Sequence, residues 1–173
     1  AKEYMFVVFV APVGPYFKGG FAANNYMITR KHDRSAPLGT GIYKVGGNYA
    51  ASLAAHEEAH ALGYGSEFYL DAKEKKYIDE CGAANFFGIK NNTYVTPKST
   101  SILPSITNKS LQQLALDLGM KVEQRAIPVE ELETFEEAGA CGTAAVISPI
   151  AELDDPEIGK KYVIAKDGKP GPI

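Results

Sequence analysis

Two neighbouring β-hairpins in the middle of the chain place the strongest limits on the fold. Residues 67–79 contain two extended runs on either side of a charged turn at 72–76. Residues 86–96 contain two more, separated by Asn91-Asn92, a pair of residues suited to a tight turn. Helical patterns lie before and after these hairpins, so the sequence predicts an α+β fold.

Three segments have helical patterns: residues 49–62, residues 108–118 and the acidic residues 129–138. In the second segment, apolar residues recur at helical spacing and predict a buried stripe. The residues of this stripe are Leu111, Leu114, Ala115 and Leu118. In the third segment we expect a solvated helix that Leu132 and Phe135 anchor to the core.

The two ends of the chain suggest a piece of a longer protein. Residues 4–10 are almost continuously apolar, which is typical of a strand covered on both faces. A connection rich in proline and glycine follows. We expect residues 1–14 to be the last strand of a preceding domain with the start of a linker. Residues 15–173 would then form one domain, truncated at its C-terminus.

Composition excludes several classes of function. The 173 residues are 45% hydrophobic and 23% charged, as in ordinary globular proteins, and a net charge of -3 favours neither nucleic acid nor an anionic membrane as partner. The longest apolar run, residues 5–13, is too short to span a bilayer, and a signal peptide is not recognisable. Cys81 and Cys141 lack metal-ligand spacing, so we expect reduced thiols in a cytoplasmic protein.

One lysine, Lys44, has unusual surroundings. It opens the stretch Lys44-Val45-Gly46-Gly47-Asn48-Tyr49, between a turn-prone, then extended segment and a helix. No Asp or Glu lies within ten residues of it in the sequence. A lysine that is desolvated and kept from ion pairs can act as an amine nucleophile. The alternative is a surface lysine beside a flexible turn.

Three further polar groups could belong to a site. Glu80 lies among small, apolar residues, where a carboxylate is costly unless a cation or donor meets it. The hydroxyl-rich residues 99–107 lead into a helix, whose first amides could bind a phosphate, although Ser105 or Thr107 could simply be N-caps. Gly142-Thr143-Ala144 forms a second turn with backbone amides and one hydroxyl.

His56 and His60 have the spacing of a two-histidine metal site. With Glu57 they match the His-Glu-x-x-His pattern of zinc proteases. The helix is short and rich in alanine, and a third ligand does not follow at a suggestive distance. We therefore do not assign a metal to this chain.

Four motifs together resemble those of the fold-type IV pyridoxal-phosphate aminotransferases, and are most similar to the branched-chain amino acid aminotransferases. They are Lys-x-Gly-Gly-Asn-Tyr at 44–49, Glu-x-Gly-x-x-Asn at 80–85, Leu-Pro-x-Ile-Thr at 103–107 and Gly-Thr-Ala at 142–144. Their order and spacing are those of the family's C-terminal domain. The chain departs from the family pattern at Ser105, where glycine is usual, and at Asn108, where arginine is common.

The resemblance implies a fold and a reaction. The fold would be the pseudobarrel-like C-terminal domain of the D-amino acid aminotransferase-like group, with mixed strands and about three flanking helices. The reaction would transfer the amino group of leucine, isoleucine or valine to 2-oxoglutarate, with pyridoxal 5′-phosphate as cofactor. Such enzymes are homodimers, and an absent N-terminal domain would supply a phosphate-binding arginine and much of the side-chain pocket.

The resemblance also implies roles for individual residues. Lys44 would form a Schiff base with the cofactor aldehyde and then move a proton between substrate and cofactor. Glu80 would pair with the pyridine nitrogen, and Tyr49 would bind the phenolic oxygen. The remaining residues would hold phosphate or substrate. Ile106, Thr107 and Thr143 would bind the cofactor phosphate, and Thr143 and Ala144 the substrate carboxylate.

Two alternatives remain open from the sequence. A D-amino acid aminotransferase or an aminodeoxychorismate lyase would share the fold and the cofactor. A cofactor-free α+β binding module would make Lys44 and Glu80 incidental.

Overall fold

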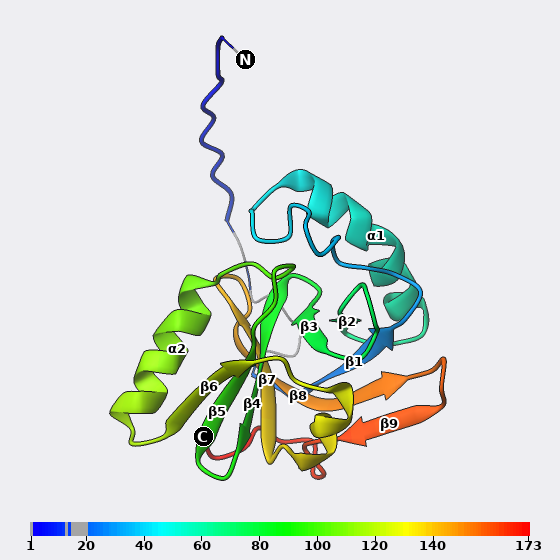
Figure 1. Cartoon of the computed structure of the whole chain (residues 1–173), viewed down its shortest axis with the longest axis vertical. Coiled ribbons are helices and arrows are strands. Elements are labelled where there is room, and N and C mark those ends of the chain that lie inside the picture. The colour runs from blue at the N-terminus through cyan, green and yellow to red at the C-terminus, as the bar shows by residue number, and fades with distance from the viewer. Residues whose placement is uncertain (1, 13, 15–20) are drawn as a thin grey trace.

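A closed ring of six strands forms the centre of the domain. The computed structural model describes residues 2–12, 14 and 21–173 (Figure 1). The ring runs in the order β3-β2-β1-β8-β7-β4, and pairing of β3 with β4 closes it. Its members are β1 (Asn24–Thr29), β2 (Ser66–Leu70), β3 (Ile78–Cys81), β4 (Ala84–Lys90), β7 (Glu137–Gly142) and β8 (Val146–Asp155). Within this ring only β1 pairs in parallel, with β2 and β8, so the barrel is mixed, as predicted.

Three strands extend the barrel outward. Strand β5 (Thr93–Pro97) continues the sheet from β4, β6 (Lys121–Arg125) pairs with β5, and β9 (Lys160–Val163) pairs with β8. Both predicted hairpins are confirmed. In the turn between β4 and β5, Asn91 and Asn92 have φ of 48° and 54°. Asparagine tolerates this left-handed conformation better than most residues, and two such residues in succession suit a tight hairpin.

Three helices flank the strands, as expected. Helix α1 (Gly46–Ala61) packs on β1 and β2, and α2 (Ile106–Asp117) packs on β5, β6 and β7. The two lie on different sides of the barrel (Figure 1). A short 3₁₀ helix, η1 (Val129–Thr134), is the third. None of the helices in the described residues is long and apolar enough to cross a membrane.

Aromatic rings fill the barrel. Phe68 and Phe86 meet edge to face with ring centroids 5.4 Å apart, and Phe86 meets Phe135 at 5.9 Å. A Cβ atom at Gly88 would lie 2.5 Å from the Phe135 ring, so only glycine fits beside it. The predicted anchors Leu132 and Phe135 are both buried in this core.

The acidic segment is not the helix that we predicted over 129–138. The 3₁₀ turn ends at Thr134, Phe135 is extended, and β7 begins at Glu137. Burial of the Phe135 ring against β4 fixes the chain in this extended form. The spacing of Leu132 and Phe135 is that of a helix, but Leu132 reaches the core from the 3₁₀ turn and Phe135 from an extended backbone.

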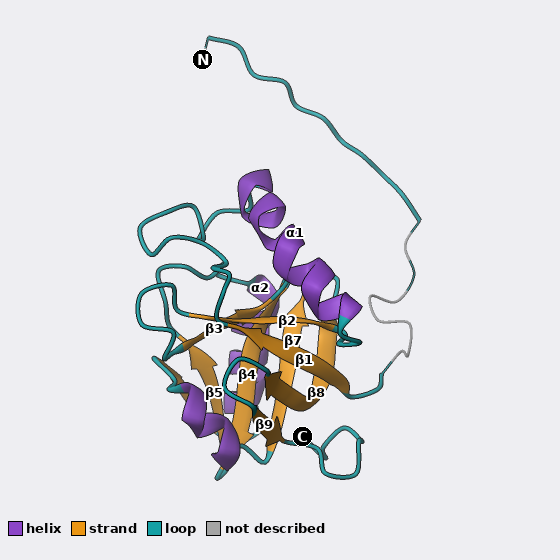
Figure 2. Ribbon diagram, turned by 90° about the vertical axis from the view of Figure 1, so that its right-hand side faces the viewer, coloured by secondary structure: helices purple, strands orange, loops and turns teal. Residues whose placement is uncertain are grey.

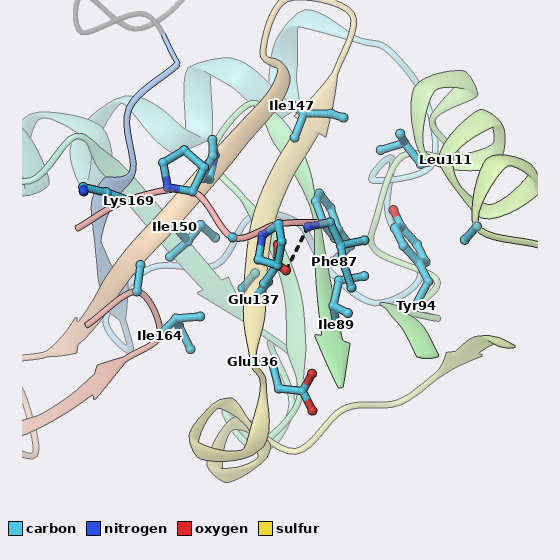
Figure 3. Close-up of a pocket in the computed structure, with 18 of the residues that line it drawn as sticks. Phe87, Ile89, Tyr94, Leu111, Glu136, Glu137, Ile147, Ile150, Ile164 and Lys169 are labelled. Atoms are coloured by element: carbon cyan, nitrogen blue, oxygen red, sulfur yellow. Dashed lines mark hydrogen bonds between the residues drawn. The ribbon is translucent and has the colours of Figure 1, made fainter. Parts of the chain in front are cut away.

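The predicted apolar stripe of α2 is buried only in part. Ala115 is buried, but Leu114 and Leu118 are 54% and 76% exposed. They line an open groove of about 600 Å³ between α2, the outer face of β4 and β5, and the C-terminal residues 165–173 (Figure 3). Stacking of Phe87 on Tyr94, at 5.0 Å, forms its floor. The helix covers a flank of the sheet, so less of its surface is enclosed than a helix over a central face would bury.

Residues 4–10 do not form the buried strand that their composition predicts. They are exposed, and residues 2–12 extend away from the barrel (Figures 1 and 2). A strand buried on both faces needs neighbours on both sides, and the described part of this chain places none beside it. The division at residue 14 remains a prediction, and residues 13 and 15–20 lie outside the described residues.

Candidate active site

Lys44 lies on a loop immediately before α1. Turns occupy residues 37–42, so the strand that we expected before Lys44 is absent from this described segment. The side chain is exposed, and its Nζ atom is 4.6 Å from the centre of the Tyr49 ring. Lys44 is therefore not desolvated in this chain. The apolar neighbours in sequence, such as Val45, do not cover Lys44, because desolvation depends on packing from elsewhere in the fold.

The backbone around Lys44 is nevertheless fixed. Asn48 is 6% exposed, and its amide nitrogen donates to the carbonyls of Thr40 and Tyr43 at 2.8 and 2.9 Å. The Thr40 hydroxyl donates to the Asn48 side-chain oxygen at 2.6 Å. The first turn of α1 thus holds the loop from which Lys44 projects. This explains why an asparagine follows the two glycines.

Glu80 is buried and has the cation that its position requires. It is 3% exposed, and its Oε1 atom forms an ion pair with Nε of Arg34, which is itself 5% exposed. Its Oε2 atom accepts a hydrogen bond from the Asn85 amide at 3.0 Å. Burial lowers the pKa of the Arg34 guanidinium, but arginine remains protonated in proteins. Glu80 is therefore held as a carboxylate.

Arg34 connects Glu80 with the lysine loop. Its Nη1 atom donates to the carbonyl of Gly41 at 3.1 Å and to that of Ser101 at 2.6 Å. A Cβ atom at Gly41 would lie 2.0 Å from the Ser101 oxygen, so glycine allows the two loops to meet. Three segments distant in sequence converge on one guanidinium.

Asn85 connects Glu80 with the start of α2. Its side-chain amide donates to the carbonyl of Leu103 at 3.0 Å as well as to Glu80. Leu103 precedes α2 by three residues. Arg34 and Asn85 together therefore hold the lysine loop and the predicted phosphate segment around one carboxylate.

The first turn of α2 has amides available for a ligand. Ser105 is the N-cap, and its hydroxyl accepts from the amide of Asn108 at 3.2 Å. Within the described chain, the amides of Ile106 and Thr107 have no acceptor, and Ile106 is 73% exposed. A cavity of about 110 Å³ adjoins this turn and reaches Asn85. Capping by Ser105 thus leaves room for anion binding at the same helix end.

The Gly142-Thr143-Ala144 turn lies two strands away from the same carboxylate. Glu80 pairs with Asn85 across β3 and β4, and Asn85 pairs with Cys141 across β4 and β7. Neighbouring strands lie about 5 Å apart, so the turn that follows Cys141 begins roughly 10 Å from Glu80. Thr143 and Ala144 are exposed. The pairing brings the fourth predicted motif to the same edge of the barrel.

Sequence reasoning missed Arg34 and did not give Asn85 its connecting role. Asn85 was present as the last residue of a motif, but its contact with Leu103 is tertiary. Arg34 stands in a polar loop ten residues before Lys44, without a local pattern. One signal was available: a buried carboxylate requires a cation, and few basic residues lie near either motif.

Two other groups can be separated from the site. Cys81 and Cys141 are free and buried, and burial raises the pKa of the Cys141 thiol to about 12, so neither suits nucleophilic chemistry. The predicted site residues, all of which the structure describes, do not line the large groove of Figure 3. Nor do the described residues contain a group of three or more His, Cys, Asp or Glu that could hold a metal ion.

Comparison with known proteins points to one family. The family Amino-transferase class IV matches residues 2–153. The branched-chain-amino-acid aminotransferase of Helicobacter pylori (strain J99 / ATCC 700824) is 56% identical over 156 residues, covering 88% of this chain and 46% of that protein. The chain spans about half the length of the curated relatives that it matches.

Solved structures agree. The branched-chain amino acid aminotransferase of Escherichia coli has a TM-score of 0.81 at 31% identity, with 94% of this chain and 51% of that chain covered. The branched-chain amino acid aminotransferase of Thermobaculum terrenum, in its holo-form with PLP, has a TM-score of 0.74 at 27% identity, with 87% and 47% covered.

Proposed function

The chain belongs to the class IV amino-transferase family, and on this premise we propose that it supplies the cofactor site of a branched-chain-amino-acid aminotransferase. The proposed reaction moves the amino group of leucine, isoleucine or valine to 2-oxoglutarate, with pyridoxal 5′-phosphate as cofactor. The observation that carries the proposal is the arrangement in which Arg34 and Asn85 join Glu80 to the lysine loop and to α2. The substrate class is supported by the relatives, which are branched-chain-amino-acid aminotransferases.

The residues of this chain fit such a cofactor. Lys44 is exposed, so its amine is available to bond to an aldehyde. Both Glu80 oxygens have partners, and each carboxylate oxygen can accept more than one hydrogen bond, so Glu80 has acceptor capacity left for one more donor. The amides of Ile106 and Thr107 stand at a helix N-terminus, where a phosphate is favoured.

When bound, pyridoxal phosphate supplies an aldehyde that bonds to amines and a ring that accepts electrons from the substrate carbon. The Lys44 amine would take the proton from the substrate Cα and deliver it to the cofactor carbon that carried the aldehyde oxygen. The guanidinium of Arg34 keeps Glu80 ionised, so Glu80 would hold a protonated ring nitrogen. Tyr49, which projects from the first turn of α1 beside Lys44, would donate to the phenolic oxygen.

Two turns would bind the anionic groups. The amides of Ile106 and Thr107, with the hydroxyls of Thr107 and Thr143, would hold the cofactor phosphate. The amides of Thr143 and Ala144 would hold the substrate carboxylate. Most of these residues are exposed, at the open edge of the site. We further propose that a homodimer closes the site and that the protein is cytoplasmic.

A visible spectrum of the intact chain tests the proposal. Addition of pyridoxal phosphate should produce an absorbance that disappears on borohydride reduction, and peptide mapping should then recover the pyridoxyl group on Lys44. Lys44→Ala should abolish this product, whereas the matched surface variant Lys73→Ala should retain it. A product mainly on Lys73 or Lys76 would contradict the site assignment, and no reducible product at all would favour a cofactor-free module. A substrate screen with D-alanine and aminodeoxychorismate separates the other class IV reactions.

A further inference from the structure

Helix α1, which begins two residues after Lys44, has little apolar surface to hold it on the barrel. Its buried residues are Asn48, Ala55 and Ala59. Two alanine methyl groups contribute far less to docking than the leucine or isoleucine stripe of an ordinary surface helix. The placement of this helix therefore depends on polar contacts to the strands beneath it.

Glu67 of β2 is the buried polar group beneath α1. It is 2% exposed, and its Oε2 atom lies 2.9 Å from Nδ1 of His56. The Ser66 hydroxyl donates to the same oxygen at 3.0 Å, and the Tyr69 hydroxyl donates to Oε1 at 3.4 Å. A buried carboxylate is stable only with such partners. His56 must carry its proton on Nδ1 to donate here.

Tyr69 of β2 is the third donor to this carboxylate, and it is fully buried. Burial raises the pKa of its hydroxyl, and Glu67 raises it further, so the hydroxyl keeps the proton that it donates. Ser52 is four residues before His56 on the same helix face, and its hydroxyl donates to the Tyr49 carbonyl at 2.9 Å. Glu67 is thus linked to α1 directly through His56, on the helix face that leads back to Tyr49 and Lys44.

Glu67 is also packed against the turn that follows Glu80. The amide of Gly82 donates to the Glu67 carbonyl at 2.9 Å. A Cβ atom at Gly82 would lie 2.7 Å from Oε1 of Glu67. The carboxylate therefore stands between the helix that follows the lysine and the turn that follows Glu80.

We propose that Glu67, itself held by Ser66 and Tyr69, is a positioning residue that fixes α1 through His56 and so sets the place of Lys44 relative to Glu80. This inference rests on the proposed function for its second half. It also gives a structural role to His56, the residue whose spacing with His60 matches a metal-site pattern. The two rings lie 4.1 Å apart, and His60 contacts the Gly65 carbonyl at 3.2 Å, while His56 serves Glu67.

Hydrogen exchange of the intact chain tests the first half without cofactor. Glu67→Gln keeps the size of the side chain but removes its charge, so amides of α1 should exchange about tenfold faster or more, while those of α2 stay unchanged. His56→Gln should act in the same way. The double variant Glu67→Gln/His56→Gln should recover part of the protection, because two amides can hydrogen-bond to each other. Unchanged α1 exchange in Glu67→Gln would overturn the proposal.

The matched control is Glu58→Gln on the same helix. Glu58 contacts Lys31 at 2.9 Å and His32 at 3.3 Å through partly exposed side chains, so its removal should change α1 exchange much less than removal of the buried Glu67 charge. Equal effects of Glu58→Gln and Glu67→Gln would show a general response to lost charge and would overturn the proposal.

Site-selective modification tests the second half. After treatment with pyridoxal phosphate and borohydride, the ratio of modified Lys44 to modified Lys73 should fall severalfold in Glu67→Gln and recover in the double variant. A folded Glu67→Gln chain with loosened α1 but an unchanged ratio would overturn the positioning role. Wild-type chain without preference for Lys44 would overturn the proposed function instead, and the exchange results would still decide whether Glu67 anchors α1.

Discussion

Arg34 and Glu80 form a buried ion pair that joins the loop before Lys44 to the strand β3. Among the described residues, neither partner has a second oppositely charged group within ion-pair distance. Both side chains are almost fully removed from water. Such a pair contributes little net stability compared with apolar groups, but loss of one partner leaves an uncompensated charge. The pair therefore contributes more to the specific arrangement of the loop and the strand than to the free energy of unfolding.

Glu80→Ala should destabilise the fold as well as the site. The Arg34 guanidinium would stay buried without its carboxylate, at a cost of about 3–5 kcal/mol, and the Asn85 amide would lose one acceptor. Urea unfolding followed by circular dichroism measures the loss. The paired variant Arg34→Met/Glu80→Leu should regain only part of the stability, because the Gly41 and Ser101 carbonyls lose their donor, and should lose cofactor binding. If Glu80→Ala unfolds like wild type, the ion pair does not exist in solution.

Asn108 should be important for the start of α2. It is 5% exposed, accepts from the Tyr94 hydroxyl at 2.8 Å and donates to the Thr96 hydroxyl at 2.9 Å. This explains the departure from arginine, because the position is enclosed and polar contacts there are already satisfied. Asn108→Ala should lose about 1–3 kcal/mol. Gln113→Ala, on the exposed face of the same helix, is the control and should change the free energy of unfolding little. Equal losses would show that the contacts are unimportant.

The acid side of the stability curve should depend on Glu131. Hydrogen bonds from Arg125, and then from Lys90 at 2.6 Å, lower the pKa of its carboxyl below the ordinary 4.5. The unfolded chain then binds more protons than the folded chain in this range. The contribution of Glu131 is present above about pH 4.5 and is lost as pH falls through the lower folded pKa.

Glu131→Gln removes this dependence. The variant should be less stable at neutral pH by about 1.5 kcal/mol or more and should lose less stability than wild type on acidification below pH 4.5. Thermal unfolding across a pH series measures both effects. Glu133→Gln is the control, because Glu133 meets Lys160 in a pair that is largely exposed. Parallel acid limbs for wild type and Glu131→Gln would contradict the assignment.

Local signals predicted most of the strands, whereas tertiary contacts decided the rest. The Asn91-Asn92 hairpin and the Ser105 cap depend on neighbours in sequence, and the structure has both. Phe135 is extended because its ring enters the barrel, which helical spacing cannot reveal. Exposure of Lys44 is also decided by tertiary packing, because no distant segment of the described chain covers it.

The site divides in the same way. The motifs around Lys44, Glu80, Ile106 and Thr143 were recognisable as short stretches with particular chemistry. Their convergence depends on Arg34 and on the contact of Asn85 with Leu103, which join residues far apart in sequence. The roles implied for the motif residues remain predictions until cofactor binding is measured.

The intact 173-residue chain should bind pyridoxal phosphate weakly and transaminate slowly. The cavity beside α2 is about 110 Å³, small compared with the roughly 300–1,000 Å³ of complete ligand pockets, and Lys44 and Ile106 face solvent. Water would compete at every charged contact, and a group misplaced by about 1 Å can lose on the order of a hundredfold in rate. The assay uses leucine, 2-oxoglutarate and excess cofactor, with Lys44→Ala as the blank. Turnover within the usual range of roughly 1–1,000 s⁻¹ would show that this chain alone forms the complete site.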